Sequence, residues 1–500
     1  MKKKIKAYLK QNKKNIITIT ITLIITFIMF IPLLVGHYAT DTYNIYNLGY
    51  KEFVKTNSFP DGRIFTAIAL MLANMVNMQV QTCSSIMLIG AIIISNIAVI
   101  ILKNIIESYK PSKNVKQQIL VTTISYISIF NFMYLDNLYF LESGIMALSV
   151  LLYIISAKIL VEKNSKYLLK SILLTIFGVM CYQGTIGLFF TYVFLFSILK
   201  NKNDIKQIIK DVVQSGIIAV ISIVFDLLLV KIAITITHRE QSRYGKISNI
   251  LTNIVYIIGT LGDMLLTTCN IFPKGVFFIY LIFLILVLDI YVIKNQKENI
   301  FFQFLGIIVM TMASAYVVNL TTLSSFDTGR LKTPYGALIG IIFMFIYVQT
   351  DIFDKKKIYK YIITFTLITF TIINIFNYES IMIQHKNVNK IEKQEARQIE
   401  EYIKEYEKET NVEVSKIARI IVKNNGKGIP NGIKTKSDFG RNALRTTWGI
   451  KGALQMYENR CLIEKVPTDD DVDEYKINGA IGQGYECIGD TFFINIYNYW

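Results

Sequence analysis

Long apolar stretches alternate with short polar loops over most of this chain, up to about residue 377. Runs of about 18 or more residues with almost no charge have the length of a helix that crosses a membrane. The pattern therefore predicts an all-α polytopic membrane protein with about eleven spans. The predicted spans are 16–35, 84–102, 118–135, 144–160, 167–182, 185–199, 212–236, 276–293, 301–320, 335–349 and 358–376.

The sequence does not decide whether the stretch 64–80 crosses the membrane. If 64–80 were a further span, the lysine-rich loop 103–116 would lie outside the cell, against the rule that positive loops stay in the cytoplasm. We therefore expect 64–80 to lie along the outer face, with Asn74, Asn77 and Gln79 toward water. A conventional span is the alternative.

Composition and charge agree with this class of protein. The chain is 53% hydrophobic and only 18% charged over 500 residues, a balance that excludes a large soluble domain. Its net charge is +17, and the lysine excess lies in short loops, which is typical of membrane orientation rather than of nucleic-acid binding. We expect a membrane protein whose N-terminus is cytoplasmic and whose C-terminus is extracytoplasmic.

Residues 378–500 differ from the rest because they are polar and charge-balanced, with the length of a small domain. We expect two domains, a transmembrane domain with catalytic outer loops at 1–377 and a small α/β extracytoplasmic domain at 378–500. The predicted elements of the second domain are helices at 392–409 and 442–457 and strands at 417–422 and 492–497.

The cysteines and histidines predict no metal or cofactor site. No cysteine pair has the spacing of zinc ligands, and the three histidines are scattered along the chain. The sequence leaves a divalent-metal requirement open. Cys461 and Cys487 both fall in the outer domain, where they form either a disulfide or two free thiols.

Candidate chemistry lies in the outer loops, since phosphate-binding glycine loops and hydrolase elbows are absent from the sequence. Asp41 and Asp61 are candidate bases, because a carboxylate just outside a span is costly unless it faces water or a partner. Positively charged residues are rare in loops outside the cell, so those that occur there are candidates for binding. Arginine suits a phosphate ligand, because its guanidinium can donate to two phosphate oxygens at once. The candidate outer cations are Arg63, a cluster of Arg239, Arg243 and Lys246 after one span, and a second cluster that contains Arg330 and Lys332.

These residues resemble a motif of the bacterial GT-C membrane glucosyltransferases that modify O-antigen, the Gtr type. In that family an outer pair of acids and an aromatic residue follow the first span, and a Gly-Arg pair comes later in the same segment. The matching positions here are Thr40, Asp41, Tyr43, Gly62 and Arg63. Cys181-Tyr182-Gln183 is similar to the Tyr-Gln turn of the family. Thr40 stands in place of the first acid, so the role of that acid falls on Asp41 alone or on Asp61.

The resemblance implies a GT-C-like glycosyltransferase of the bacterial inner membrane. It would move a sugar, expected to be glucose, from a polyprenyl-phosphate donor at the outer leaflet to a hydroxyl of a cell-surface glycan. Asp41 would be the base, and Arg330 with Arg239 or Arg243 would hold the lipid phosphate. Arg63 would contact the donor or brace a carboxylate, and Gln183 and Lys246 would bind substrate. The C-terminal domain is then expected to modulate acceptor choice.

Two alternatives remain from the sequence alone. A lipid or glycan transporter should show internal two-fold repetition and charges within spans, for which Asp226 and Lys231 are the candidates. A surface-polysaccharide polymerase or ligase would carry long outer loops with arginines, but it needs no carboxylate directly after the first span.

Overall fold

A computed structural model describes most of the chain. The described residues are 18–202, 204–238, 249–296, 298–320, 328–355, 357–420, 442–478 and 484–495. They separate into two compact units. The first unit takes in the described residues up to Ile31, Lys55–Ala69 and Ile86–Ser380, and the second takes in Pro32–Val54, Leu70–Ser85 and the described residues from Ile381 onward.

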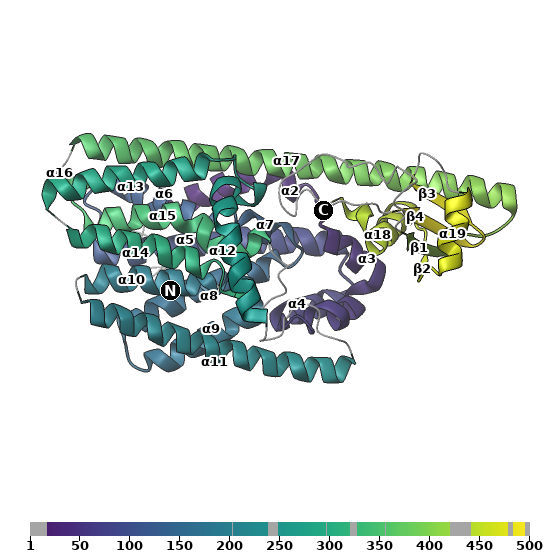
Figure 1. Ribbon diagram of the computed structural model, residues 1–500, viewed down its shortest axis with the longest axis horizontal. Helices are drawn as coiled ribbons and strands as arrows, with labels where there is room; N and C mark the ends of the chain where they lie inside the picture. The colour runs from purple at the N-terminus through teal and green to yellow at the C-terminus, as the bar shows by residue number, and fades with distance from the viewer. Residues whose placement is uncertain are drawn as a thin grey trace, which may run out of the picture. The chain divides into compact units, whose positions relative to one another are not determined.

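Long helices make up the first unit, and several of them run side by side in Figure 1. Eight of the described helices are long and apolar enough to cross a membrane. The protein is thus a helical polytopic membrane protein, and the count of eleven spans stays a prediction. The main helices are α5 (Val80–Tyr109), α6 (Val115–Ile129), α8 (Ser143–Glu162), α9 (Tyr167–Cys181), α10 (Gly187–Asn201), α11 (Ile205–Thr237), α12 (Ile250–Thr267), α13 (Val276–Asn295), α14 (Glu298–Ser314), α15 (Thr333–Gln349) and α17 (Lys357–Thr410).

Short elements connect these helices and carry much of the polar chemistry. They are α2 (Ile31–Leu34), α3 (Thr40–Phe53), η1 (Val54–Ser58), α4 (Ile64–Met75), α7 (Leu135–Tyr139), η2 (Gln183–Thr185), η4 (Thr268–Asn270), η5 (Val318–Leu320), η6 (Gly329–Lys332) and α16 (Ile352–Lys355).

Helix α15 forms the centre of the first unit. Every residue from Thr333 to Tyr347 is buried, as expected for a helix that is apolar on all sides. Gly340 allows α15 to approach α6 closely, because an added Cβ would lie 2.1 Å from the Ser128 hydroxyl. Small residues at helix contacts are the usual means of close packing between membrane helices.

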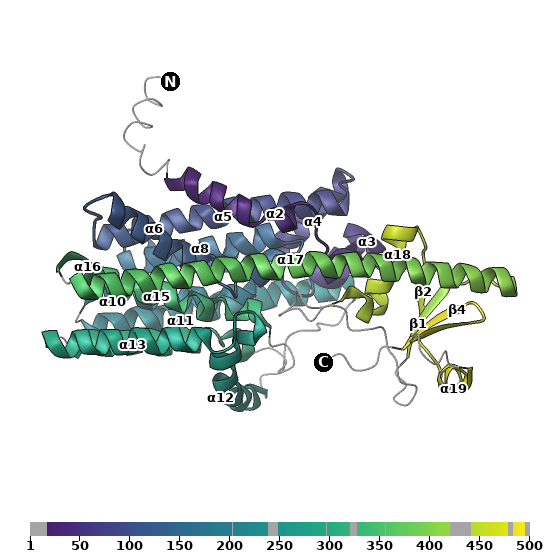
Figure 2. The same ribbon diagram turned by 90° about the horizontal axis from the view of Figure 1, so that it is seen from above.

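Two segments near the predicted outer face are too short or lie in the wrong direction for a simple span. Helix α4 has 12 residues and so reaches only about 18 Å, against about 30 Å for the apolar core of a bilayer. Helix α12 crosses the direction of α13 and α14 in Figure 1 and is seen nearly end-on in Figure 2. Such a direction is typical of a helix at the membrane surface. The placement of 64–80 on the outer face remains a prediction.

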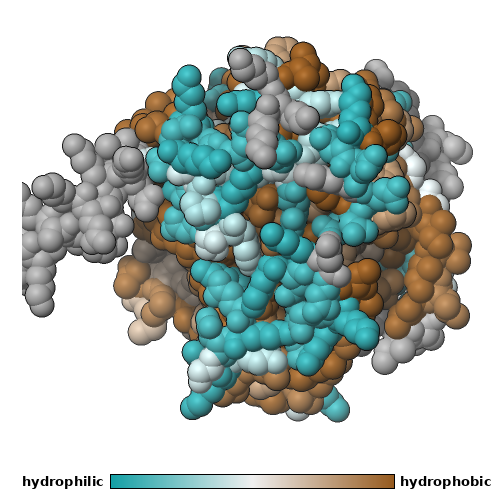
Figure 3. Space-filling model, turned by 90° about the vertical axis from the view of Figure 1, so that its left-hand side faces the viewer, coloured by the Kyte–Doolittle hydropathy of each residue, from teal (hydrophilic) through white to brown (hydrophobic). Residues whose placement is uncertain are grey.

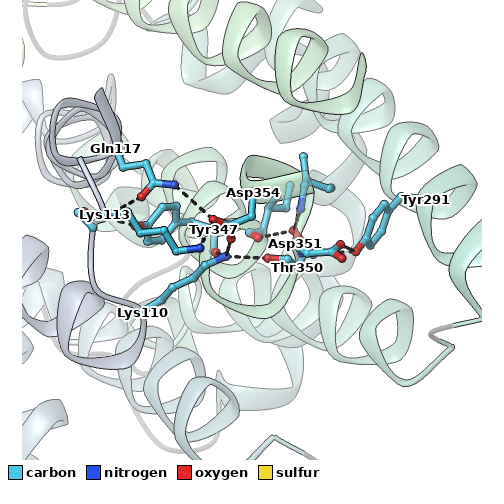
Figure 4. Close-up of polar contacts among 11 residues, drawn as sticks. Lys110, Lys113, Gln117, Tyr291, Tyr347, Thr350, Asp351 and Asp354 are labelled. Carbon is cyan, nitrogen blue, oxygen red and sulfur yellow. Dashed lines mark hydrogen bonds and ion pairs between the residues drawn. The ribbon is translucent and has the colours of Figure 1, made fainter. Parts of the chain in front are cut away.

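The end of the first unit that carries α16 is polar. Figure 3 shows hydrophilic side chains across its middle, with hydrophobic ones around them. Lys110 Nζ donates to the carbonyls of Tyr347 and Thr350 at 2.9 and 2.8 Å, at the C-terminal end of α15 (Figure 4). Cations stabilise helix C-termini because the carbonyls there lack helical partners.

Asp354 ties this polar end together. Its carboxylate pairs with Lys110 at 2.9 Å and with Lys113 at 2.7 Å (Figure 4). Burial would raise the pKa of Asp354, but the hydrogen bonds from the two lysines outweigh it and lower the pKa to about 2. This carboxylate therefore contributes stability above its unfolded pKa, and that stability is lost only as the pH falls toward about 2.

The second unit holds a small α/β fold. Its sheet has the order β2-β1-β4-β3, with β1 parallel to both neighbours and β3 antiparallel to β4. The end of α17 and helix α18 pack on one face through Ile403, Ile450 and Ile417, and α19 packs on the other through Tyr475. The elements are β1 (Lys416–Ile420), α18 (Thr447–Glu458), β2 (Ile463–Lys465), α19 (Asp469–Asn478), β3 (Tyr485–Ile488) and β4 (Thr491–Asn495).

The two cysteines of the predicted outer domain, Cys461 and Cys487, are free. Cys461 is exposed and Cys487 is buried in the core beneath the sheet. Of the two possibilities left open by the sequence, the structure therefore has two thiols rather than a disulfide.

Candidate functional site

Four short segments of the first unit bring charged side chains together. They are the loop before α4, the start of α8, η2 and η6, and both η2 and α7 contact η6. In Figure 1, α7 lies away from the polar end that carries α16. The segments belong to four of the outer loops predicted from the sequence, so the site is assembled from loops.

Gly62 shapes the first of these segments. Its φ of +73° lies in the region that favours glycine, and an added Cβ would lie within 3 Å of Gln183, Asp226 and Val230. The turn directs the next residue, Arg63, into the interior, where it is 7% exposed. A glycine is needed here both for the backbone angle and for space.

Arg63 is held by two carboxylates. Its Nη1 lies 2.6 Å from Glu142 Oε1, its Nη2 lies 3.9 Å from Asp61 Oδ2, and its guanidinium lies over the ring of Tyr182. Burial lowers the pKa of Arg63, but the charges of Asp61 and Glu142 raise it more strongly, so the net shift is upward. The positive charge of Arg330 opposes this rise in the pKa of Arg63.

Gln183 fastens the same loop to α11. Its Nε2 donates to the backbone carbonyl of Asp61 at 2.9 Å and to the carboxylate of Asp226 at 3.0 Å. Asp226 is buried, whereas Lys231 is exposed, so Asp226 has a partner in the bundle other than the lysine considered from the sequence. In this arrangement Gln183 orients the Asp61–Arg63 turn, and its contact with substrate stays a prediction.

Segment η6 adds two more buried cations. Arg330 is 4% exposed and its guanidinium lies 4.2 Å from the centre of the Phe140 ring. Lys332 is fully buried, with Nζ 2.7 Å from Asn319 Oδ1 and 3.5 Å from the centre of the Tyr316 ring. Such cation–π contacts are strongest where water is excluded.

Asn137 fixes this segment to α7. Its side-chain amide donates to Thr333 Oγ1 at 3.0 Å and toward the carbonyl of Arg330 at 3.4 Å. The backbone that carries the two cations is therefore held by a buried polar contact at its C-terminal end. Three buried cations, Arg63, Arg330 and Lys332, thus lie on loops of one unit.

The structure places the candidate residues from the sequence in different parts of the molecule. Asp61, Arg63, Gln183 and Arg330 all belong to the first unit. Sequence reasoning missed Glu142 as the partner of Arg63, although an acid in the predicted outer loop 136–143 was visible. Arg239, Arg243 and Lys246 lie outside the described residues.

Asp41 belongs to the second unit, in the first turn of α3. It is partly exposed, and its carboxylate makes no hydrogen bond or ion pair with any residue that the structure describes. This contrasts with Asp61, which is 7% exposed and lies beside Arg63. Within the described part of the chain, no group of three or more His, Cys, Asp or Glu side chains is placed to hold a metal ion.

Comparison with known families decides the class of the protein. The profile of the family described as Glucosyl transferase GtrII matches residues 31–345, which is more than half of the chain. The chain belongs to the GtrII glucosyl transferase family. The match confirms the resemblance to Gtr-type glucosyltransferases and covers every candidate residue from Asp41 to Arg330. Searches among curated proteins and among solved structures found no match.

Family and fold together make this protein a membrane glucosyltransferase. The buried cations on the loops of the first unit therefore belong to a GtrII transferase. The matched region ends within α15, so the sheet of the second unit and the helices that cover it are additional to the region that defines the family.

Proposed function

We propose that this GtrII transferase moves glucose from a polyprenyl-phosphate donor to a hydroxyl of a cell-surface glycan, at the outer face of the bacterial inner membrane. The observation that carries this proposal is the set of buried cations, Arg63, Arg330 and Lys332, on loops of the first unit that lie away from the polar end that carries α16. A lipid-linked phosphate is an anion that arrives from the bilayer, and such a set suits it.

The cations serve the leaving group. When the bond between the sugar carbon and the phosphate oxygen breaks, the electron pair stays on the phosphate, and charge develops there. Arg330 and Lys332 lie against the rings of Phe140 and Tyr316, where low polarity strengthens their interaction with an anion. Arg330 is the main phosphate holder in the proposal, and Arg63, which pairs with Glu142, supports the turn beside it. Arg239, Arg243 and Lys246 are proposed to assist it.

Asp41 is the proposed base. As the acceptor oxygen bonds to the sugar carbon, its proton must pass to a nearby group, and a carboxylate without a partner can take it. Asp41 meets this condition among the described residues, whereas Asp61 is buried beside Arg63. The products are then the glycosylated acceptor and the polyprenyl phosphate.

The donor class is tested with the full-length chain in proteoliposomes. We expect labelled glucose to pass from polyprenyl-phosphate glucose to a surface-glycan acceptor, and not from nucleotide-linked glucose. Liposomes without the protein are the control. Transfer from the nucleotide sugar with the lipid-linked sugar untouched would overturn the proposed donor.

The orientation is tested with a thiol reagent that cannot cross membranes. Cys461 is free and exposed, so it should be labelled from outside once the outer membrane or wall is made permeable. In a Cys461→Ser background, Lys116→Cys, at an exposed position of the lysine-rich loop, should be labelled only after the inner membrane is opened. Labelling of Lys116→Cys in sealed cells would place that loop outside.

A further inference from the structure

The segment that carries Asp41 packs as part of the second unit. Residues Pro32–Val54 group with the residues from Ile381 onward, and α3 packs against α18. Because α18 and the sheet lie beyond residue 345, the region matched by the family profile does not include this support. The packing raises the question of what the C-terminal residues do for Asp41.

Tyr43 anchors α3 two residues after Asp41. The side chain is fully buried, and its hydroxyl donates to Glu392 Oε2 at 2.9 Å and lies 3.1 Å from the Tyr457 hydroxyl. Glu392 Oε1 accepts a hydrogen bond from the backbone of Ala443 at 2.7 Å. One buried carboxylate on α17 therefore ties α3 to the segment that leads into α18.

Asn389 holds the chain on the other side of Asp41. Its Oδ1 accepts from the backbone N–H of Tyr38 at 3.0 Å, and its Nδ2 donates to the carbonyl of the same residue at 2.9 Å. A side-chain amide that bonds both backbone groups of one residue fixes the direction of the chain there. Asp41 is thus bracketed by anchors at Tyr38 and Tyr43, both bound to residues of α17.

Gly452 allows α18 to approach the backbone of α3 closely. An added Cβ at this position would lie 2.1 Å from the carbonyl oxygen of Tyr43 and 2.6 Å from its carbonyl carbon. The atoms in the way belong to the backbone of α3, which cannot rotate aside as a side chain would. Even an alanine here must displace α3.

We propose that the residues of the second unit from Ile381 onward are the scaffold that positions Asp41, with Glu392, Asn389 and Gly452 as positioning residues. The inference rests on the proposed function, in which Asp41 is the base. It gives the C-terminal residues a more central role than the modulation of acceptor choice expected from the sequence, because the proposed base lies on a segment that they hold in place.

Gly452→Ala in the full-length chain is the test. Alanine is the better helix former, so α18 itself is not weakened, and any effect comes from the displaced α3. We expect turnover to fall by roughly tenfold to a hundredfold, as for a small misplacement of a reacting group, with the dissociation constant for polyprenyl phosphate unchanged. Lys451→Ala, at the adjacent position of α18, is the matched control and should behave as the wild type. Unchanged turnover in Gly452→Ala would overturn the proposal.

A double variant separates positioning from general damage. If Gly452 acts through Asp41, then Asp41→Asn combined with Gly452→Ala should be no slower than Asp41→Asn alone. If the loss of turnover in the double variant equals the product of the two single losses, the two residues act independently, and the proposal is overturned. Tyr43→Phe, which removes only one hydroxyl, should also lower turnover. This variant tests the proposal if Gly452→Ala does not fold.

Amide hydrogen exchange of residues 40–53 provides a readout that needs no donor. It should quicken in Gly452→Ala and stay unchanged in Lys451→Ala, because the anchors of α3 are loosened only in the first. Unchanged exchange in Gly452→Ala would overturn the packing argument. If the wild type does not use the lipid donor, the proposed function fails, and the exchange measurement still tests the scaffold.

Discussion

Replacing Asp41 with asparagine is expected to lower the turnover of glucose transfer by about 10²–10⁴, the usual contribution of a general base. Asparagine keeps the size and shape of the side chain but cannot accept the proton of the acceptor hydroxyl. Binding of polyprenyl-phosphate glucose should stay near that of the wild type, since the proposed phosphate holders, Arg330 among them, are untouched. Steady-state rates and donor binding in proteoliposomes measure the two effects.

Asp61→Asn is the matched control for this prediction. Asp61 is buried near Arg63, and Gln183 holds its backbone, so its carboxylate serves the arginine in our proposal. Its replacement should cost less than that of Asp41. The reverse ranking would transfer the base role to Asp61, and normal rates in both variants would exclude both carboxylates as the base.

The hydropathy pattern was enough to predict the class of fold and many of its helices. The predicted span 335–349 corresponds closely to α15 (Thr333–Gln349), and the predicted strand 417–422 overlaps β1 (Lys416–Ile420). Both elements have strong local signals, a long apolar run in one case and a short β-branched run in the other. Local patterns of this kind survive without knowledge of the tertiary contacts.

The contacts of the site could not be predicted in the same way. Arg63 and Glu142 are 79 residues apart in the sequence, and Gln183 and Asp226 are 43 apart. Nothing in the periodicity of either segment identifies its partner, because such pairs are set by how helices pack. A motif of the Gtr type indicated Arg63 and Gln183, but it left their roles in holding a turn to be found in the structure.

One division between the two units falls after Ser380, and the domain boundary after residue 377 stays a prediction. Hydropathy gives no sign, however, that Pro32–Val54 packs with the C-terminal residues of the second unit. The reason is physical, since α3 is joined to that unit by buried hydrogen bonds such as Tyr43 to Glu392 and by a glycine contact. These features depend on single residues, and a hydropathy average does not register them.

Arg330→Ala is expected to lower kcat/KM for the lipid donor by about 10²–10³, which is typical for the loss of one group that stabilises developing charge. The guanidinium is buried against Phe140, where water cannot replace it readily. Arg330→Lys should recover only part of the loss, because lysine keeps the charge but not the two-pronged hydrogen bonding to phosphate oxygens. Initial rates against donor concentration measure both.

Arg397→Ala provides the control, since this arginine is 58% exposed and pairs with Glu458 in the second unit. It should leave donor kinetics unchanged. Because Arg330 is buried, its variants must also be compared with the wild type in thermal unfolding, so that lost folding is not mistaken for lost catalysis. A folded Arg330→Ala protein with wild-type donor kinetics would remove Arg330 from the phosphate site. An Arg330→Lys protein as fast as the wild type would mean that a positive charge suffices there and that the fork is not used.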